Sequence, residues 1–354
     1  MSTTFNQKGN EDITWETLNN FNIGLEFSFW KGKLSGTFDY YAKKTKDMLF
    51  SISVPMSSGY SSYMGNVGSI TNRGIELVLN SHLIATKDMD LNLSFNIAHN
   101  RTKWNEISEA RTKAHGGYVY SSSYAARWFT EGGSFYTKFL PAYAGVNENG
   151  EALYWVDANV GHNTAEPGYN KDYTTTNWNE ASYYVTEETY PDAVGGFSIN
   201  FRWRDFDVTA NFDYQIGGKI YDYQYASYMS PDVAESDGYT IHKDYLKSWS
   251  VNNTSSNIPR WQYNDDYTSA VSDRFLTNSG YLNFQSFTVG YTLPKSILRS
   301  SPLSSVRFYV AGENLWFISA RQGLDPRYGF NSSATMTAYN QAVRNITGGV
   351  QISF

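Results

Sequence analysis

The chain has 354 residues and a formal net charge of −6, with 17% aromatic residues but a mean hydropathy of only −0.49. The acidic balance argues against a nucleic-acid-binding protein, because such proteins cluster Lys and Arg on one face. The chain has no cysteine, which excludes disulfide frameworks and thiolate metal sites. No stretch reaches the roughly 18 apolar residues of a membrane helix, although barrel strands would escape such a search.

The dominant pattern is an alternation of apolar and polar residues, which places successive side chains on opposite faces of a β-strand. The clearest examples run from Met89 to Ile97 and from Phe206 to Tyr214. A shift of the apolar parity near Gln285 predicts a β-bulge. Nine strands are predicted in total, near residues 14–29, 33–50, 69–84, 89–104, 194–204, 205–220, 281–293, 305–317 and 343–354.

The connections between these strands alternate between short and long. The long ones are residues 51–68, 105–192, 221–280 and 318–342. Outer-membrane barrels have short periplasmic turns and long extracellular loops, whereas soluble sandwiches scatter loop lengths over both ends. The pattern therefore predicts an all-β fold, an antiparallel transmembrane β-barrel segment. Because ordinary barrels have an even number of strands, we expect further strands before residue 1, and an open, curved sheet for this chain alone.

Several short motifs stand in a fixed order along the chain. NRGIEL at 72–77 is followed by SGYLNFQSFTVGYTLPK at 279–295, VRFYVAGENL at 306–315 and GLDP at 323–326. The chain then ends on the alternating run TGGVQISF, with Phe354 last. Together these motifs resemble the C-terminal barrel portion of the SusC/RagA family of TonB-linked (TonB-dependent) outer-membrane proteins. The resemblance extends from Thr14 to Phe354.

The resemblance implies a barrel of about 22 strands with a plugged lumen, which is a size class of outer-membrane transporters. It also implies TonB-dependent import of an oligosaccharide, or alternatively a peptide, through the outer membrane of a Bacteroidetes-like bacterium. The implied partners are a SusD-like surface lipoprotein and the TonB complex, which would act through a plug portion that this chain is expected to lack. No cofactor is implied.

The polar face of the predicted strands supplies one set of candidate site residues. If their apolar neighbours face lipid, these side chains point into the lumen; the alternative is the solvated face of a soluble sheet. The predicted lumen-facing residues are Glu26, Asp39, Glu76, Asn92, Asn96, Arg202, Asp207, Asn211, Asp213, Arg307 and Glu313.

Aromatic residues of the long loops supply a second set. They are candidate stacking platforms for sugar rings or peptide side chains, and the alternative is that they pack the loops together or form the interfacial aromatic girdle. These residues are Trp128, Tyr143, Trp155, Trp178, Tyr221, Tyr223, Tyr225, Trp249 and Trp261.

Signatures of catalysis and metal binding are lacking in the sequence. The five histidines, His115 among them, show no zinc spacing, and no nucleophile elbow or nucleotide-binding loop occurs. Asp157, Asn159 and Gly161 have the alternate spacing of a calcium loop without its distal Glu, which favours an Asx turn. We therefore expect neither an enzyme nor a metal site. The principal rival is a secreted, soluble β-sandwich or propeller that binds glycans, and a glycoside hydrolase ranks third.

Overall fold

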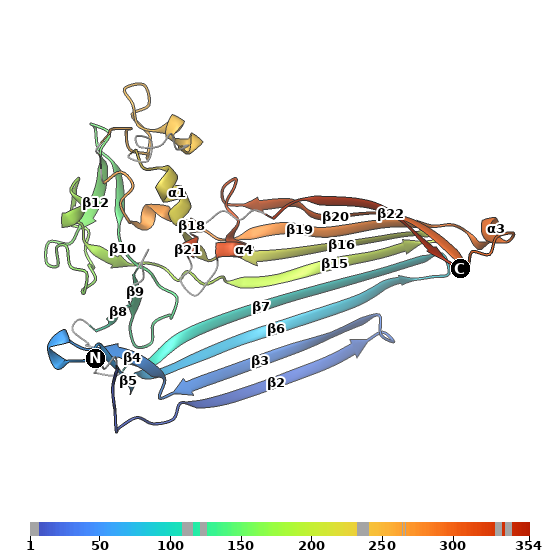
Figure 1. Ribbon diagram of the computed structural model, residues 1–354, viewed down its shortest axis with the longest axis horizontal. Coiled ribbons are helices and arrows are strands. Elements are labelled where there is room, and N and C mark those ends of the chain that lie inside the picture. Colours follow the sequence, from blue (N-terminus) through green and yellow to red (C-terminus); the bar gives the residue numbers. More distant parts are fainter. Residues whose placement is uncertain are drawn as a thin grey trace, which may run out of the picture.

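In the computed structural model of the chain, residues 7–107, 116–120, 126–231, 241–263, 265, 267–329, 335–336 and 342–354 are described. The largest element is one antiparallel sheet of nine strands, ordered β2-β3-β6-β7-β15-β16-β19-β20-β22 (Figure 1). This confirms the predicted all-β, antiparallel architecture. The strands are β2 (Thr17–Phe29), β3 (Leu34–Lys46), β6 (Gly68–Ala85), β7 (Met89–Ile107), β15 (Ala193–Trp203), β16 (Phe206–Ile216), β19 (Tyr281–Thr292), β20 (Ser305–Ser319) and β22 (Asn345–Ser353).

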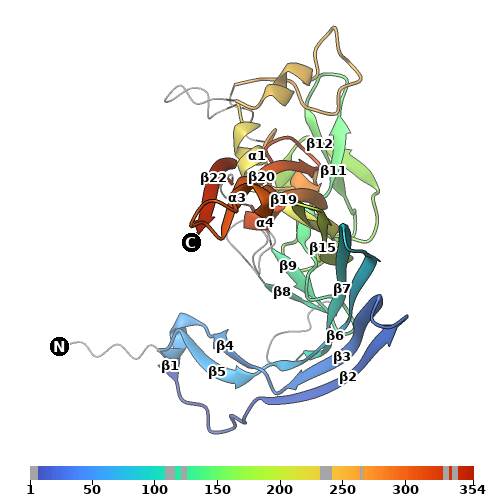
Figure 2. The same ribbon diagram turned by 90° about the vertical axis from the view of Figure 1, so that its right-hand side faces the viewer.

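The sheet is open and curved. In the described part of the chain β2 and β22 form its two edges, and Figure 2 shows the strands following an arc between those edges. Each strand pairs with the sheet strand that precedes it in the chain, so the sheet is a simple up-and-down meander. The expectation of an open, curved sheet is thereby confirmed.

At one end of the sheet all connections are short, and we call it the short-turn end. β2 turns into β3 at Trp30 and Lys31, which adopt positive φ angles of 51° and 60°. β15 and β16 are joined by two residues, and Arg204 takes a φ of 52° there. The connection between β19 and β20 holds the short helix α3 (Lys295–Leu298). Such tight turns fix the strand register and hence which residues share a face.

The predicted bulge lies at Gln285. On β16, Asn211 pairs with Ser286 but the next residue, Phe212, pairs with Phe284. The bulge therefore skips Gln285, and it is confirmed. Because of this extra residue, Phe284 and Phe287 both lie on the apolar face although they are three residues apart.

The opposite end carries the long connections. We call their described residues, within 47–67, 108–192, 217–280 and 320–344, the loop cluster; they contain short strands and helices (Figure 1). The strands are β4 (Leu49–Ser53), β5 (Ser62–Asn66), β8 (Tyr118–Tyr120), β9 (Arg127–Phe129), β10 (Phe139–Pro141), β11 (Tyr143–Val146), β12 (Ala152–Val156), β13 (Tyr173–Thr175), β14 (Tyr183–Val185), β17 (Lys219–Asp222), β18 (Leu276–Asn278) and β21 (Thr335–Met336). β1 (Gln7–Lys8) lies before the sheet in the chain and pairs with β5. The helices are η1 (Met56–Ser58), η3 (Trp178–Glu180), α1 (Tyr223–Tyr228), η4 (Lys243–Lys247), η5 (Asp273–Phe275) and α4 (Pro326–Gly329).

Buried apolar clusters lie in the loop cluster and where strands enter it. One joins Leu140, Tyr221 and Phe275 from two different long connections, and a second contains Trp104 and Phe129. Apolar residues of the sheet are far more exposed, as for Leu25 at 60%. Among the described helices, none has both the length and the apolar character to cross a membrane.

Candidate functional site

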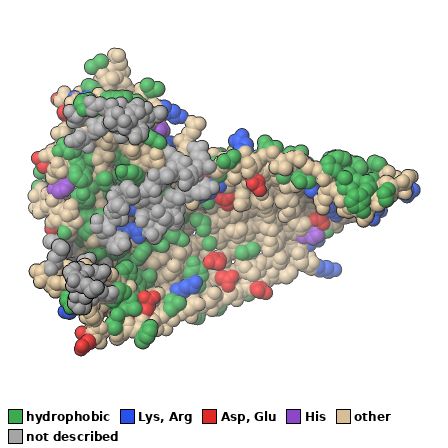
Figure 3. All heavy atoms as spheres, viewed as in Figure 1, with side chains coloured by type: hydrophobic (Ala, Val, Ile, Leu, Met, Phe, Trp, Pro, Cys, Tyr) green, Lys and Arg blue, Asp and Glu red, His purple; other side chains and the backbone are tan. Residues whose placement is uncertain are grey.

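The sheet has one polar face and one apolar face. The strand register places all eleven predicted lumen-facing residues on the same side. This is the concave side, which faces the viewer in Figure 3 and shows scattered charges among mostly uncharged polar side chains and backbone. We call it the concave wall. Whether it lines a lumen remains a prediction.

The centre of the concave wall is a lattice of neutral hydrogen-bonding groups. One register row across four strands consists of Ser94, Ser198, Asn211 and Ser286. The Asn211 amide donates to the Ser286 hydroxyl over 2.9 Å. The next row consists of Asn92, Asn200, Thr209 and Thr288. Such a surface offers donors and acceptors without net charge.

A hollow of about 350 Å³ opens in this lattice where β7, β15 and β16 meet. Asn96, Asn211 and Asp213, three of the predicted residues, line it with Gly196. A Cβ on Gly196 would lie 2.8 Å from the Phe212 carbonyl oxygen, so the position requires glycine and stays open. The Asn283 amide donates to Asp213 over 2.6 Å and holds that carboxylate at the rim.

Charged residues gather toward the short-turn end of the same wall. His82 and Asp90 lie 2.9 Å apart, and the Arg307 guanidinium forms two bonds to Asp207. Arg202 faces both Asp90 and Asp207 in the register. Charges of alternating sign thus cross the sheet from Asp90 on β7 to Arg307 on β20.

The remaining predicted wall residues are acidic. Asp39 and Glu76 face each other across β3 and β6, while Glu26 faces Thr37. Glu313 lies opposite Ser286 beside the bulge. The carboxylates therefore line the wall near the β2 edge and beside the bulge, flanking the neutral centre.

The convex face carries two rows of aromatic residues. Near the short-turn end Trp203, Phe206, Tyr291 and Phe308 face one another in the register, and the Phe206 and Tyr291 rings lie 4.6 Å apart. Nearer the loop cluster the row is Phe95, Phe197, Phe212, Phe284 and Trp316. On β15 and on β16 the two rows are six residues apart. At the rise per residue of a β-strand this is a distance of about 20 Å between the rows. This matches the girdles and the apolar band of about 25 Å of outer-membrane barrels.

Most of the predicted loop aromatics pack against other loop residues. Trp128 and Tyr221 are buried, and the Tyr143 hydroxyl donates to the Asn257 carbonyl oxygen. Burial raises the pKa of Tyr143 to about 12, so its hydroxyl keeps its proton. Trp178 donates its indole N–H to the Val271 carbonyl oxygen.

The other loop aromatics are partly buried or exposed. The Trp155 ring faces the Lys171 ammonium, Trp249 packs on Gly150, and the Arg321 guanidinium lies over Tyr225. Tyr223 is 39% exposed and Trp261 46% exposed. The structure thus divides the predicted set into packing residues and two exposed aromatics, and ligand contact by any of them stays a prediction.

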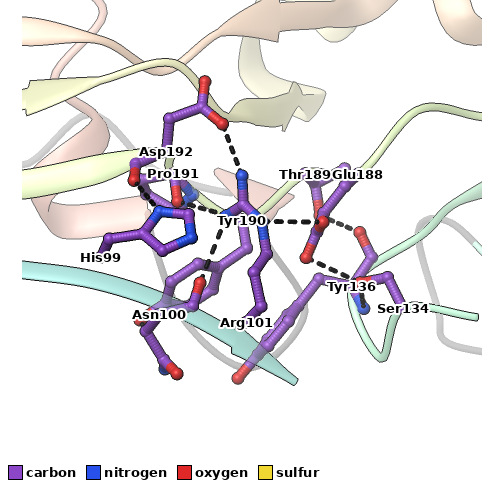
Figure 4. A network of polar contacts seen from close by, with 10 residues as sticks. All are labelled: His99, Asn100, Arg101, Ser134, Tyr136, Glu188, Thr189, Tyr190, Pro191 and Asp192. Atoms are coloured by element: carbon purple, nitrogen blue, oxygen red, sulfur yellow. Dashed lines mark hydrogen bonds and ion pairs between the residues drawn. The ribbon is translucent and has the colours of Figure 1, made fainter. Parts of the chain in front are cut away.

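A polar network fastens the longest connection to the sheet (Figure 4). Arg101 of β7 bonds to Asp192 over 2.5 Å and to the Pro191 carbonyl oxygen over 2.8 Å, and its side chain lies 3.3 Å from Glu188. The Ser134 hydroxyl donates to Glu188 from the other side. The network sets where residues 126–192 sit above the strands.

A larger cavity, about 520 Å³, lies between β19, β20 and the segment that contains α4. Trp316, Arg327 and Arg344 line it together with Asn283, which is 1% exposed. These residues were not among the predicted sites. The bulge and the GLDP motif at 323–326 were the sequence signals near them, and neither predicts a cavity, because it is made by residues 322–327 folding back on two strands.

No group of three or more His, Asp or Glu side chains able to hold a metal occurs among the residues that the structure describes. Asp157 accepts backbone N–H bonds from Asn159, Tyr169 and Asn170. The bonds from Asn170 and Tyr169 hold the pKa of its carboxyl below the usual value. The predicted Asx turn is therefore present at Asp157, and His115 lies outside the described residues.

Comparison with known proteins gives matches along the whole chain. The family model described as TonB dependent receptor-like, beta-barrel matches residues 1–242. TonB-dependent receptor P3 of Formosa agariphila is 28% identical over 91% of this chain, which corresponds to 32% of the length of that receptor. TonB-dependent receptor SusC of Bacteroides thetaiotaomicron is 26% identical over 90% of this chain, which corresponds to 30% of the length of SusC. The solved RagAB peptide transporter superposes with a TM-score of 0.78 at 23% identity, over 98% of this chain and 36% of that one.

These matches agree with the motif order and with the aromatic rows of the convex face. The chain spans about a third of the length of the relatives that it matches. Within those relatives it corresponds to barrel strands and the loops between them. The chain belongs to the family described as TonB dependent receptor-like, beta-barrel, and is part of a barrel of the bacterial outer membrane.

Proposed function

We propose that the complete receptor imports a neutral oligosaccharide through the outer membrane in a TonB-dependent step, and that the concave wall is its lumen surface. The neutral lattice carries this proposal: amide and hydroxyl groups fill the register rows at the centre of the wall. Sugar hydroxyls both donate and accept, as these side chains do. The hollow at Gly196 lies beside this lattice and exposes Asn96 and Asn211.

In the same proposal the loop cluster faces the outside and, with a SusD-like surface lipoprotein, captures the substrate. In this proposal the exposed rings of Tyr223 and Trp261 stack on sugar rings. The rival reading of a secreted, soluble glycan-binding protein does not agree with membership of an outer-membrane family. Nor does a soluble sheet account for the aromatic rows on the convex face.

A peptide substrate is the second candidate. It is favoured by the likeness to the solved structure named as a peptide transporter, and peptide bonds also pair with Asn side chains. Charged side chains of a peptide would meet the alternating charges near the short-turn end, such as Arg202.

The test compares two neighbouring substitutions on β15. Ser198→Trp fills the hollow on the concave wall, whereas Ile199→Trp adds the same ring to the convex face. A strain that depends on this receptor is grown on single neutral oligosaccharides or on oligopeptides. We expect Ser198→Trp to slow growth on an oligosaccharide at least tenfold and Ile199→Trp to leave it unchanged. Equal growth of both variants on every substrate, or a defect confined to peptides, contradicts the proposed substrate.

A further inference from the structure

Basic residues cluster on the convex face where the apolar band ends toward the loop cluster. Tyr40 and Ile75 face each other at the upper edge of the band on β3 and β6. Arg73 lies on β6 two residues closer to the loop cluster than Ile75, and it stands opposite Ala42. In the next row of the same face, Lys44 and Lys103 flank Thr71 from either side.

These side chains are accessible and uncommitted. Lys44, Arg73 and Lys103 are exposed, as is Lys46 beyond them. Within the described ranges none of the four has an ion pair. Arg101, in the same region of β7, is by contrast occupied by Glu188 and Asp192. We call Lys44, Lys46, Arg73 and Lys103 the convex basic patch.

The floor and the surroundings of the patch favour an anion. The Thr71 hydroxyl and the Asn105 amide group bond to each other between the cations, so the centre is polar and neutral. Glu106 faces Ser69 further from the apolar band, and the carboxylates of Glu188 and Asp192 are already paired with Arg101, opposite Arg73. Adjacent strands lie about 5 Å apart, so the three flexible side chains around Thr71 are long enough to reach one group the size of a phosphate.

We propose that the convex basic patch binds the phosphate groups of an anionic lipid in the outer leaflet. The patch adjoins the row of Ile23, Tyr40 and Ile75, against which acyl chains would lie. A free phosphate ion would gain nothing from that apolar neighbour, whereas a phosphorylated lipid satisfies both surfaces. The leaflet assignment rests on the proposed orientation, with the loop cluster outside.

The test uses the protein expressed from its complete reading frame and purified in detergent. Binding of a synthetic phosphorylated lipid A is compared with that of its dephosphorylated form by native mass spectrometry. The test variant combines Lys44→Gln, Arg73→Gln and Lys103→Gln. The matched control removes three other exposed cations through Lys43→Gln, Lys87→Gln and Lys295→Gln. Heat-modifiable mobility on gels verifies that every variant is folded.

Each cation near an anionic lipid surface strengthens binding about fivefold, so loss of three lowers the affinity for the phosphorylated lipid by about 100-fold. We expect that loss in the test variant and no loss in the control. Equal affinity for the two lipids, equal loss in both variants, or displacement of the lipid by millimolar inorganic phosphate overturns the proposal.

Orientation is tested separately by labelling an S255C variant in intact cells with an impermeant maleimide. Surface labelling without phosphate selectivity overturns the lipid site and leaves the proposed function standing. Labelling only after the outer membrane is permeabilised overturns the orientation, and the outer-leaflet assignment with it.

Discussion

The sheet and the loop cluster are both rich in aromatic residues, yet the same residue types do opposite things in them. On the convex face Phe21 and Phe29 are more than half exposed, whereas Tyr154 and Phe275 in the loop cluster have 0% exposure. The loop cluster therefore holds itself together as a small soluble domain does, through burial. The sheet has no such core on its convex side, and we propose that lipid covers that face.

Within the loop cluster, the sharpest test compares a buried aromatic residue with an exposed one. Tyr221→Ala opens a cavity in the cluster around Phe275 and Leu140, and removal of a buried aromatic side chain costs about 3 to 5 kcal/mol. We expect the loops to become sensitive to protease while the strands stay folded, as judged by heat-modifiable mobility. Trp261→Ala, in contrast, should weaken ligand binding rather than loop stability. Equal protease sensitivity of the two variants contradicts the division into packing and exposed aromatics.

The next effect concerns the apolar face of the sheet. Val289 lies on the convex face between the two aromatic rows, and its neighbour Thr288 lies on the concave wall. An Arg on the lipid face near the bilayer centre costs about 2 to 4 kcal/mol. Val289→Arg should therefore reduce the folded receptor in outer-membrane fractions severalfold, while Thr288→Arg leaves it near the wild-type level. A similar loss in both variants would show that the convex face does not meet lipid.

A third effect separates local polar contacts in the loops from the sheet. The Asp157 carboxylate accepts three backbone N–H bonds. A hydrogen bond to a charged group contributes roughly 1.5 to 3 kcal/mol, and removal of the carboxylate also leaves the N–H donors without a partner. We expect Asp157→Ala to speed amide hydrogen exchange at Tyr169 and Asn170 without affecting β15 or β16. Unchanged exchange at those two amides would contradict this account.

The same carboxylate predicts a pH dependence. Backbone N–H bonds lower its pKa below that of the unfolded chain, so its stabilising contribution is complete above about pH 4 and is lost as the pH falls further. In Asp157→Ala the exchange of the Tyr169 amide, corrected for intrinsic rates, should lose this acid sensitivity. Acid sensitivity equal to that of the wild type would assign it to another group.

The smallest effect concerns the junction between the two regions. Arg101→Ala removes the contacts to Glu188, Asp192 and the Pro191 carbonyl oxygen, for which we expect about 1 to 3 kcal/mol of local destabilisation because two carboxylates lose their partner. Hydrogen exchange should rise in residues 188–192 only. Arg73→Ala, which removes the residue opposite Arg101 in the register, is the matched control and should change nothing there.

What the sequence predicts differs between the regions for a physical reason. Strand faces follow from an alternation that is local, so residues as far apart as Glu26 and Glu313 were assigned to one face from their immediate neighbours. The bulge at Gln285 was visible because it breaks the same local rule. Positions in the loop cluster depend instead on contacts over long sequence separations, such as Tyr154 to Tyr267 or Arg101 to Asp192.

For that reason sequence alone did not separate Tyr221, which is buried, from Tyr223, which is exposed. It also missed the cavity beside α4, which requires residues 322–327 to fold back over Asn283 and Trp316. The neutral lattice is an intermediate case. Its members were visible as polar strand positions, but the rows of Ser94, Ser198 and Asn211 depend on a register that only the paired strands reveal.

The most direct test of the central claim, a two-faced sheet with lipid on its convex side, is single-cysteine labelling along β16 in a chain that has no cysteine of its own. Residues from 207 to 212 are replaced one at a time in the complete receptor in native membranes and treated with a hydrophilic maleimide. The account predicts reaction at 207, 209 and 211 and protection at 208, 210 and 212. Reaction without this alternation, or protection of the first set, would contradict it.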